Sequence, residues 1–238
     1  MISVSPSQGL ELEISGPFAD GLDIPENLVL KAARLLKKEY DVSAGAKLHL
    51  VKNLPIASGI GGGSADAAAA LRLLNHYWNL NKSQFDLEKV AETLGADVPA
   101  CISSETAIGF GIGQDLKPLK NRPFAGMHVL LANPLVTIST KDIFEKWNGV
   151  DIGPLNFDDV SALLIDGRND LQSIAMALSD SIAPLLTAIE TTDPLAARMS
   201  GSGATCFGIY KNAELALTAE KSLHSSIDKI WTMTGTLR

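Results

Sequence analysis

The feature that most constrains the fold is a cluster of four glycines, Gly59 and Gly61–Gly63, followed at once by an alanine-rich run. Before it, residues 48–51 alternate in polarity, which predicts a strand, and after it residues 64–78 are helical in pattern, with Ser64 as the expected N-cap. Such a loop can hold an oxyanion, because glycines let the backbone curl and the first helical N–H groups point at the anion. The alternative is a flexible turn that only caps a core helix.

Two common phosphate-binding motifs are excluded by the residues of this loop. A Walker loop needs lysine and then Ser or Thr after its last glycine, but Ser64 and Ala65 follow here. A dinucleotide fingerprint needs a glycine at the sixth position from Gly59, and Ser64 occupies that position. Asp66, expected in the first helical turn, suits the helix dipole but would repel a phosphate unless a divalent cation lies between them.

A second candidate is Asp97, in the segment Gly95-Ala96-Asp97-Val98-Pro99. An aspartate shortly before a proline predicts a helix N-cap or an Asx-turn. A carboxylate can also accept the proton of an attacking hydroxyl in phosphoryl transfer, and a capping bond would hold it in place. Both interpretations stay open from the residues alone.

Two further polar segments also allow two interpretations. Ser139 or Thr140 is the expected cap of a helix over residues 142–147, and capping alone would explain a hydroxyl there. Residues 200–205, Ser-Gly-Ser-Gly-Ala-Thr, lie between strand-like segments and are consistent with a simple hairpin turn.

Taken together, these segments resemble the motifs of the GHMP kinases, the family of galactokinase and of homoserine, mevalonate and phosphomevalonate kinases. Residues 55–65 are similar to the family's second motif, the loop that holds ATP phosphates. Residues 95–99 resemble the context of its catalytic aspartate, and residues 200–204 resemble its third motif, which folds back against the phosphate loop and the acceptor substrate. Asn169-Asp170-Leu171 also occurs in the family, and we assign it a capping role.

The resemblance implies a two-domain α+β fold. Residues 1–148 would form an N-terminally incomplete ATP-binding domain of left-handed βαβ type, and residues 149–238 a ferredoxin-like C-terminal domain. From the residues themselves, the alternating strands at 2–4 and 10–14 predict a hairpin, and the loop-rich segment 148–165 predicts the domain boundary. The elements expected beyond it, helix–helix–strand–strand–helix–strand, are typical of a small α+β layer.

The resemblance also implies the roles of individual residues. Asp97 would act as the catalytic base, and Mg²⁺ would neutralise phosphate charge. ATP would be bound by the loop residues Pro55, Ile56, Ala57, Ser58, Gly59, Ile60, Gly61, Gly62, Gly63, Ser64 and Ala65. The acceptor substrate and phosphates would lie near Thr140, Gly201, Ser202 and Gly203. No metal-ligand spacing is visible among the four histidines and two cysteines, so no protein metal ligand is predicted.

The implied activity is that of an ATP-dependent small-molecule kinase. The triple-glycine form of the loop is most similar to the branch that phosphorylates the 2-hydroxyl of a cytidine-diphosphate-linked methylerythritol, in non-mevalonate isoprenoid (terpenoid) precursor synthesis. The sequence lacks the family's N-terminal Ala-Lys-x-Asn-Leu strand, whose lysine partners the aspartate, and the following Gly-Tyr-His segment. Two alternatives therefore stay open: a catalytically impaired nucleotide-binding remnant, or a GHMP kinase for another small alcohol.

Composition narrows the remaining classes of partner. The net charge of −7 disfavours non-specific binding to nucleic acid, and the apolar runs are too short to span a membrane. The first residues show neither a basic segment nor an apolar core of a targeting signal. With only two cysteines, Cys101 and Cys206, the sequence disfavours a disulfide framework and indicates a protein of the reducing cytoplasm. The oligomeric state is not predicted.

Overall fold

The computed structural model describes residues 1–111, 113, 115–119, 123–150, 152–155 and 160–237. Its contacts divide the chain into two compact units, residues 1–56 with 61–120 and residues 57–60 with 121–238. Each unit has its own cluster of buried apolar side chains. The boundary predicted at residues 148 and 149 lies inside the second unit.

The first unit is built on a three-stranded sheet of β1 (Ile2–Ser5), β2 (Leu10–Ser15) and β3 (Ala46–Val51), in the order β1–β3–β2. β3 is antiparallel to β1 and parallel to β2. The predicted hairpin of the first two strands is therefore wrong, because β3 lies between them. Leu48 and Leu50 of β3 are buried, and pairing on both sides satisfies the backbone of this central strand.

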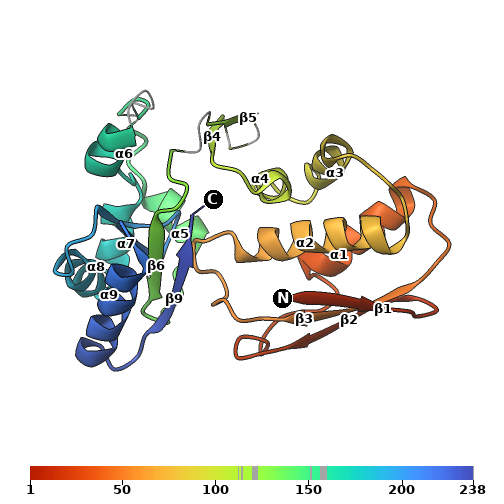
Figure 1. Ribbon diagram of the computed structural model, residues 1–238, viewed down its shortest axis with the longest axis horizontal. Helices are drawn as coiled ribbons and strands as arrows, with labels where there is room; N and C mark the ends of the chain where they lie inside the picture. Colours follow the sequence, from red (N-terminus) through yellow and green to blue (C-terminus); the bar gives the residue numbers. More distant parts are fainter. Residues whose placement is uncertain (112, 114, 120–122, 151, 156–159, 238) are drawn as a thin grey trace. The chain divides into compact units, whose positions relative to one another are not determined.

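Helices cover one face of this sheet. α1 (Leu28–Glu39) and α2 (Gly62–Tyr77) lie against each other over the strands (Figure 1) and bury Val29, Leu36, Leu71 and Leu74 against the sheet's apolar face. α1 begins after Asn27, whose side chain caps the helix by accepting a hydrogen bond from Val29 N. The unit's remaining elements are α3 (Gln84–Ala91), α4 (Val98–Ser103), β4 (Ala107–Phe110) and β5 (Asp115–Pro118).

The second unit contains a four-stranded antiparallel sheet in the order β7–β8–β6–β9. Its strands are β6 (His128–Asn133), β7 (Ala196–Met199), β8 (Cys206–Tyr210) and β9 (Trp231–Thr236). β6, the first of them in the chain, lies inside the sheet between β8 and β9. The ferredoxin-like arrangement therefore needs residues well before 148, which is why the unit begins earlier than predicted.

Five helices of the described residues accompany this sheet, and α8 and α9 both pack on its strands (Figure 1). They are α5 (Thr140–Lys146), α6 (Val160–Asp166), α7 (Gln172–Leu178), α8 (Ile182–Glu190) and α9 (Ala213–Ser226). α6 corrects the prediction of a loop over the whole of residues 148–165, in which residues 151 and 156–159 lie outside the described part. A helix of seven residues is too short to give a clear periodic signal.

Along the described ranges, none of the helices has both the length and the apolar character required to span a lipid bilayer.

Candidate active site

The first glycine loop (residues 59–63) enters α2 earlier than predicted. The helix starts at Gly62, and its N-cap is Gly61 in the left-handed conformation with φ 64° and ψ 21°. The prediction of Ser64 as N-cap is therefore wrong, because glycine adopts this conformation without the steric cost of a Cβ atom. Ala65 N donates to Gly61 O at 2.9 Å, so the N–H groups of residues 62–64 lie at the open end of the helix.

This helix start fits a phosphate group. A Cβ atom added to Gly61 would find no described atom within 4 Å, so the space beside the first turn is open. Backbone N–H groups and the positive end of the helix dipole both favour an anion at such a position. The cradle consists of backbone, so it requires no lysine after the glycines.

Asp66 lies in the second turn of α2 and not in the first, and it has a cationic partner. Lys52 Nζ lies 2.5 Å from Asp66 Oδ2, and the two side chains are only 7% and 18% exposed. The lysine offsets the negative charge that was expected to repel a phosphate. Lys52 was not singled out from the sequence, in which its only signal is a charged residue directly after a buried strand.

Asp97 occupies the N-cap position of α4, but its side chain makes no capping bond. Its backbone is in the right-handed helical region, with φ −84° and ψ −14°, whereas a capping aspartate normally has an extended backbone. The side-chain cap predicted for Asp97 is thus wrong. Within the described residues the exposed carboxylate makes no hydrogen bond or ion pair, which leaves both oxygens able to accept a proton.

The second unit contains residues 57–60, and they pack against the second glycine loop (residues 200–203). Ser200 Oγ donates to Gly59 O at 2.8 Å, and Thr205 N donates to Ser58 O at 3.2 Å. A Cβ atom on Gly59 would lie 2.4 Å from Ser200 O, and one on Gly201 would lie 2.8 Å from Gly59 O. The backbones approach so closely that only glycine fits at these two positions.

Thr140 and Ser202 are also brought together in the second unit. The N-cap of α5 is Ser139, whose side chain accepts from Asp142 N, and Thr140 is the first helical residue. Thr140 Oγ1 lies 2.8 Å from Ser202 Oγ. A hydroxyl from α5 and one from the second glycine loop therefore form one polar pair.

The predicted site residues are thus divided between the two units. Pro55, Ile56, Gly61–Ala65 and Asp97 belong to the first unit, together with Lys52. Residues 57–60, Thr140 and Gly201–Gly203 belong to the second unit.

Asn169 has a role that the sequence did not indicate. Its Oδ1 accepts from Leu171 N at 3.0 Å, which forms an Asx-turn ahead of α7, but the N-cap of that helix is Leu171 itself. Asn169 Nδ2 donates to Met199 O and to Gly201 O, both at 2.8 Å. The assigned capping role is therefore replaced by a tie to the second glycine loop.

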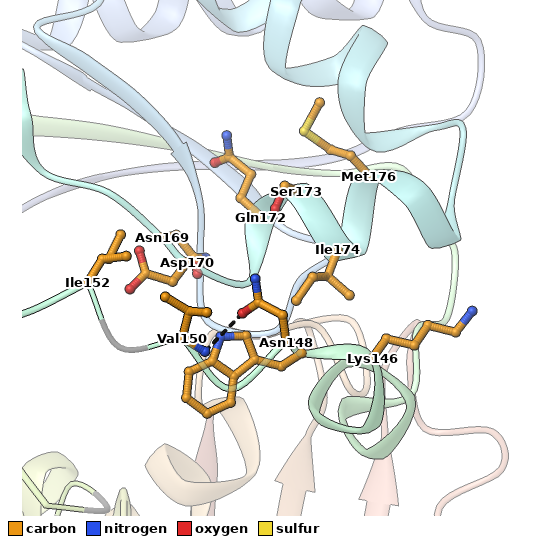
Figure 2. Close-up of a pocket in the computed structure, with 11 residues that line it drawn as sticks. Lys146, Asn148, Val150, Ile152, Asn169, Asp170, Gln172, Ser173, Ile174 and Met176 are labelled. Atoms are coloured by element: carbon orange, nitrogen blue, oxygen red, sulfur yellow. Dashed lines mark hydrogen bonds between the residues drawn. The ribbon is translucent and has the colours of Figure 1, made fainter.

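A cavity of about 530 Å³ lies beside α7 in the same unit. Figure 2 shows Asn148, Asn169 and Gln172 among its lining residues, together with the apolar side chains of Val150, Ile152, Ile174 and Met176. The amide oxygens of these three polar residues accept hydrogen bonds from backbone N–H groups of the fold itself. These contacts give the amides a structural role in loop conformation.

No group of three or more His, Cys, Asp or Glu side chains in the described ranges is arranged to hold a metal ion. Both cysteines are free thiols.

Family models match both units of the chain. The GHMP kinases N terminal domain matches residues 27–105, and the GHMP kinases C terminal domain matches residues 159–228. The chain belongs to the GHMP kinases, and it is a small-molecule ATP-dependent kinase of that family.

Curated relatives narrow the class. The 4-diphosphocytidyl-2-C-methyl-D-erythritol kinase of Erythrobacter litoralis is 44% identical over 232 residues, which cover 95% of this chain and 82% of the relative. The enzyme of the same name from Sphingopyxis alaskensis is 41% identical, with the same coverage of 95% and 82%.

Solved structures agree on the fold. A crystal structure of 4-(cytidine 5'-diphospho)-2C-methyl-D-erythritol kinase matches with a TM-score of 0.79 and 27% identity, over 98% of this chain and 84% of that one. A homoserine kinase from Cytophaga hutchinsonii matches with a TM-score of 0.70 at 18% identity, over 99% and 84%, and shows the fold alone.

Proposed function

We propose that this chain phosphorylates the 2-hydroxyl of 4-diphosphocytidyl-2-C-methyl-D-erythritol with ATP, a step of non-mevalonate isoprenoid precursor synthesis. The observation that carries the proposal is the open, glycine-capped start of α2, which offers backbone donors to phosphate oxygens. The acceptor is supported by relatives of that name, which are 44% and 41% identical over 95% of the chain.

Each site residue has a role in this proposal. The N–H groups of residues 62–64 bind phosphate oxygens. The ion pair with Lys52 neutralises the Asp66 carboxylate, which would otherwise repel the phosphate. Asp97 accepts the proton of the acceptor hydroxyl as the oxygen attacks phosphorus, since its carboxylate makes no bond within the described residues. The hydroxyls of Thr140 and Ser202 orient the reacting groups by hydrogen bonds.

Mg²⁺ is included in the proposal as the ion that neutralises the charge of the transferred phosphoryl group. This ion usually keeps several waters and binds through substrate phosphates and one or two carboxylates. The start of α2 fits that mode, because the N–H groups of residues 62–64 would hold the phosphates, and the ion would be held through phosphate oxygens and water. We also place the enzyme in the cytoplasm, where a reducing environment keeps Cys101 and Cys206 as free thiols.

The experiment that tests this function measures ATP–Mg²⁺-dependent phosphorylation of 4-diphosphocytidyl-2-C-methyl-D-erythritol by the parent chain and by Asp97→Asn. Asp23→Asn is the matched control, because Asp23 is an exposed aspartate of the same unit. We expect Asp97→Asn to lower kcat by about 10²-fold or more while the Kd for ATP stays within about twofold. The control keeps the parent rate.

Three results would contradict the proposal. Equal turnover by Asp97→Asn would remove Asp97 as the base. ATP binding without any turnover by the parent would favour a nucleotide-binding protein that lacks kinase activity. Turnover of other small alcohols but not of the methylerythritol compound would show that the acceptor is wrong.

A further inference from the structure

β7 pairs with β8 on one side, and on its other side the end of the strand is bonded by side chains and not by another strand. β7 is an edge strand of the four-stranded sheet, and Met199 is its last residue. Met199 N donates to Gln172 Oε1 at 2.9 Å, and Met199 O accepts from Asn169 Nδ2 at 2.8 Å. Two side chains near the start of α7 therefore satisfy the outward backbone groups that an edge strand leaves open.

Asn169 uses its whole amide in this arrangement. Its Nδ2 donates to Gly201 O as well as to Met199 O, and its Oδ1 accepts from Leu171 N. The orientation of the amide follows from its partners, because two carbonyl oxygens require the NH₂ group and one N–H requires the oxygen. A residue with three such bonds fixes the start of the second glycine loop against α7.

The same loop is tied to residues 57–60 on its other side. Ser200 Oγ donates to Gly59 O, and the missing Cβ atoms of Gly59 and Gly201 allow the two backbones to touch. Gly203 also lies against residue 59, since a Cβ atom added to Gly59 would lie 2.7 Å from Gly203 N and 2.8 Å from Gly203 O. Contacts this close leave little freedom to move one loop without the other.

We propose that Asn169 is a positioning residue that sets the conformation of residues 57–60 through the second glycine loop. This inference rests on the nucleotide role proposed above for the first glycine loop, which begins in this segment. The chain of contacts is continuous, from Asn169 to Gly201 and from Ser200 to Gly59. Its amide is thereby a determinant of nucleotide affinity, although it lies outside the motifs that bind ATP.

Asn169→Asp is the most specific change, because it keeps the size of the side chain and the acceptor for Leu171 N. It replaces the NH₂ donor with a carboxylate oxygen that faces the carbonyl oxygens of Met199 and Gly201. Unpaired carbonyls and charge repulsion then push the second glycine loop away from α7.

Asn148→Asp is a closely matched control. Asn148 lines the same cavity (Figure 2), and its Oδ1 accepts from Val150 N at 3.0 Å, as Asn169 Oδ1 does from Leu171 N. Its Nδ2 donates to none of the described residues. The two variants therefore share the chemical change and the Asx-turn, and they differ in the two donated bonds.

The test has a structural arm and a binding arm, both on the full chain. Amide hydrogen exchange is measured at Gly203 and Thr205, whose N–H groups bond to Ser200 O and Ser58 O. Leu130 and Gly208, paired across β6 and β8, report on the sheet itself. The Kd for ATP–Mg²⁺ is measured by calorimetry. We expect exchange at Gly203 and Thr205 and the Kd to rise by about tenfold in Asn169→Asp, with no change at the sheet amides.

The outcomes separate this inference from the proposed function. Parental exchange rates at Gly203 and Thr205 in Asn169→Asp would overturn it, as would faster exchange with an unchanged Kd, or equal effects in Asn148→Asp. If the parent chain binds no ATP, the proposed function fails, and the exchange arm still decides whether Asn169 holds the loop. If the sheet amides of Asn169→Asp also lose protection from hydrogen exchange, the test is repeated with Asn169→Ser, which adds no charge. Loss of protection across the sheet in Asn169→Ser as well would overturn the inference.

Discussion

Lys52 Nζ and Asp66 Oδ2 form a direct ion pair, 2.5 Å apart, between residues fourteen positions apart in the chain. Lys52 follows β3 and Asp66 lies in the second turn of α2, so the pair links the strand before the first glycine loop to the helix after it. A Cβ atom on Gly62 would lie 3.5 Å from Lys52 Nζ, which places the ammonium group against the first turn of the helix.

Lys52→Met will destabilise the protein, because it leaves the Asp66 carboxylate poorly solvated and unpaired. Breaking a buried ion pair typically costs about 3 kcal/mol, and the free energy of unfolding in urea measures the loss. The double variant Lys52→Met with Asp66→Leu should be more stable than Lys52→Met alone, because it removes the remaining charge. A single variant as stable as the parent would show that the pair contributes nothing to the fold.

Gly59→Ala and Gly63→Ala should have opposite consequences. A Cβ atom at Gly59, where φ is 74°, would lie 2.4 Å from a backbone oxygen. Gly63 lies within α2, and a Cβ atom there would lie 3.6 Å from a methyl group of Leu28. We expect Gly59→Ala to cost about 2 kcal/mol or more, and Gly63→Ala to be neutral or to stabilise the fold by about 0.5 kcal/mol. Urea unfolding of both variants checks this, and equal stabilities would contradict the close approach of the two glycine loops.

The sequence predicted most elements whose signal is local. The strand predicted over residues 48–51 is β3, and Ser139, one of the two expected caps, is the N-cap of α5. The helix start at Ser64 was misplaced, because residue preference favours serine as a cap whereas the observed start depends on the backbone angle of Gly61. Pairing of strands is not local, which explains the wrong hairpin between β1 and β2.

The motifs of the site were recognisable, but the contacts that hold them were not. Lys52 and Asn169 lie far in the sequence from Asp66 and Gly201, their partners in space. Neither residue type is unusual at its position, so only the folded structure shows that each holds a glycine loop. Asp97 was found through its sequence context, yet its free carboxylate reflects a backbone conformation that no local pattern indicated.

Asp86 provides a prediction for how the free energy of unfolding changes at acidic pH. Hydrogen bonds from the Ser83 side chain and backbone lower the pKa of the Asp86 carboxyl below its ordinary value. A lowered pKa in the folded state means that this contribution is complete above the unfolded pKa and is lost as the pH falls through the folded one. Asp86→Asn should therefore flatten the decline of stability below about pH 4, as measured by urea unfolding at several pH values. An unchanged pH dependence would contradict this.

Cys206 provides a prediction for thiol reactivity and stability at alkaline pH. Its side chain is fully buried, and burial raises the pKa of the thiol to about 12. At pH 8 about one molecule in 10⁴ would carry the reactive thiolate, so labelling of Cys206 requires opening of the second unit's core. In a Cys101→Ala variant, which leaves a single thiol, an aromatic disulfide reagent should label Cys206 only as fast as the protein unfolds in urea. Because the raised pKa favours the neutral thiol, its contribution to stability is complete below the unfolded pKa and declines as the pH rises from about 9 toward the folded value. Rapid labelling of the folded protein at pH 8 would show that the thiol is accessible and that the core around β8 is not closed.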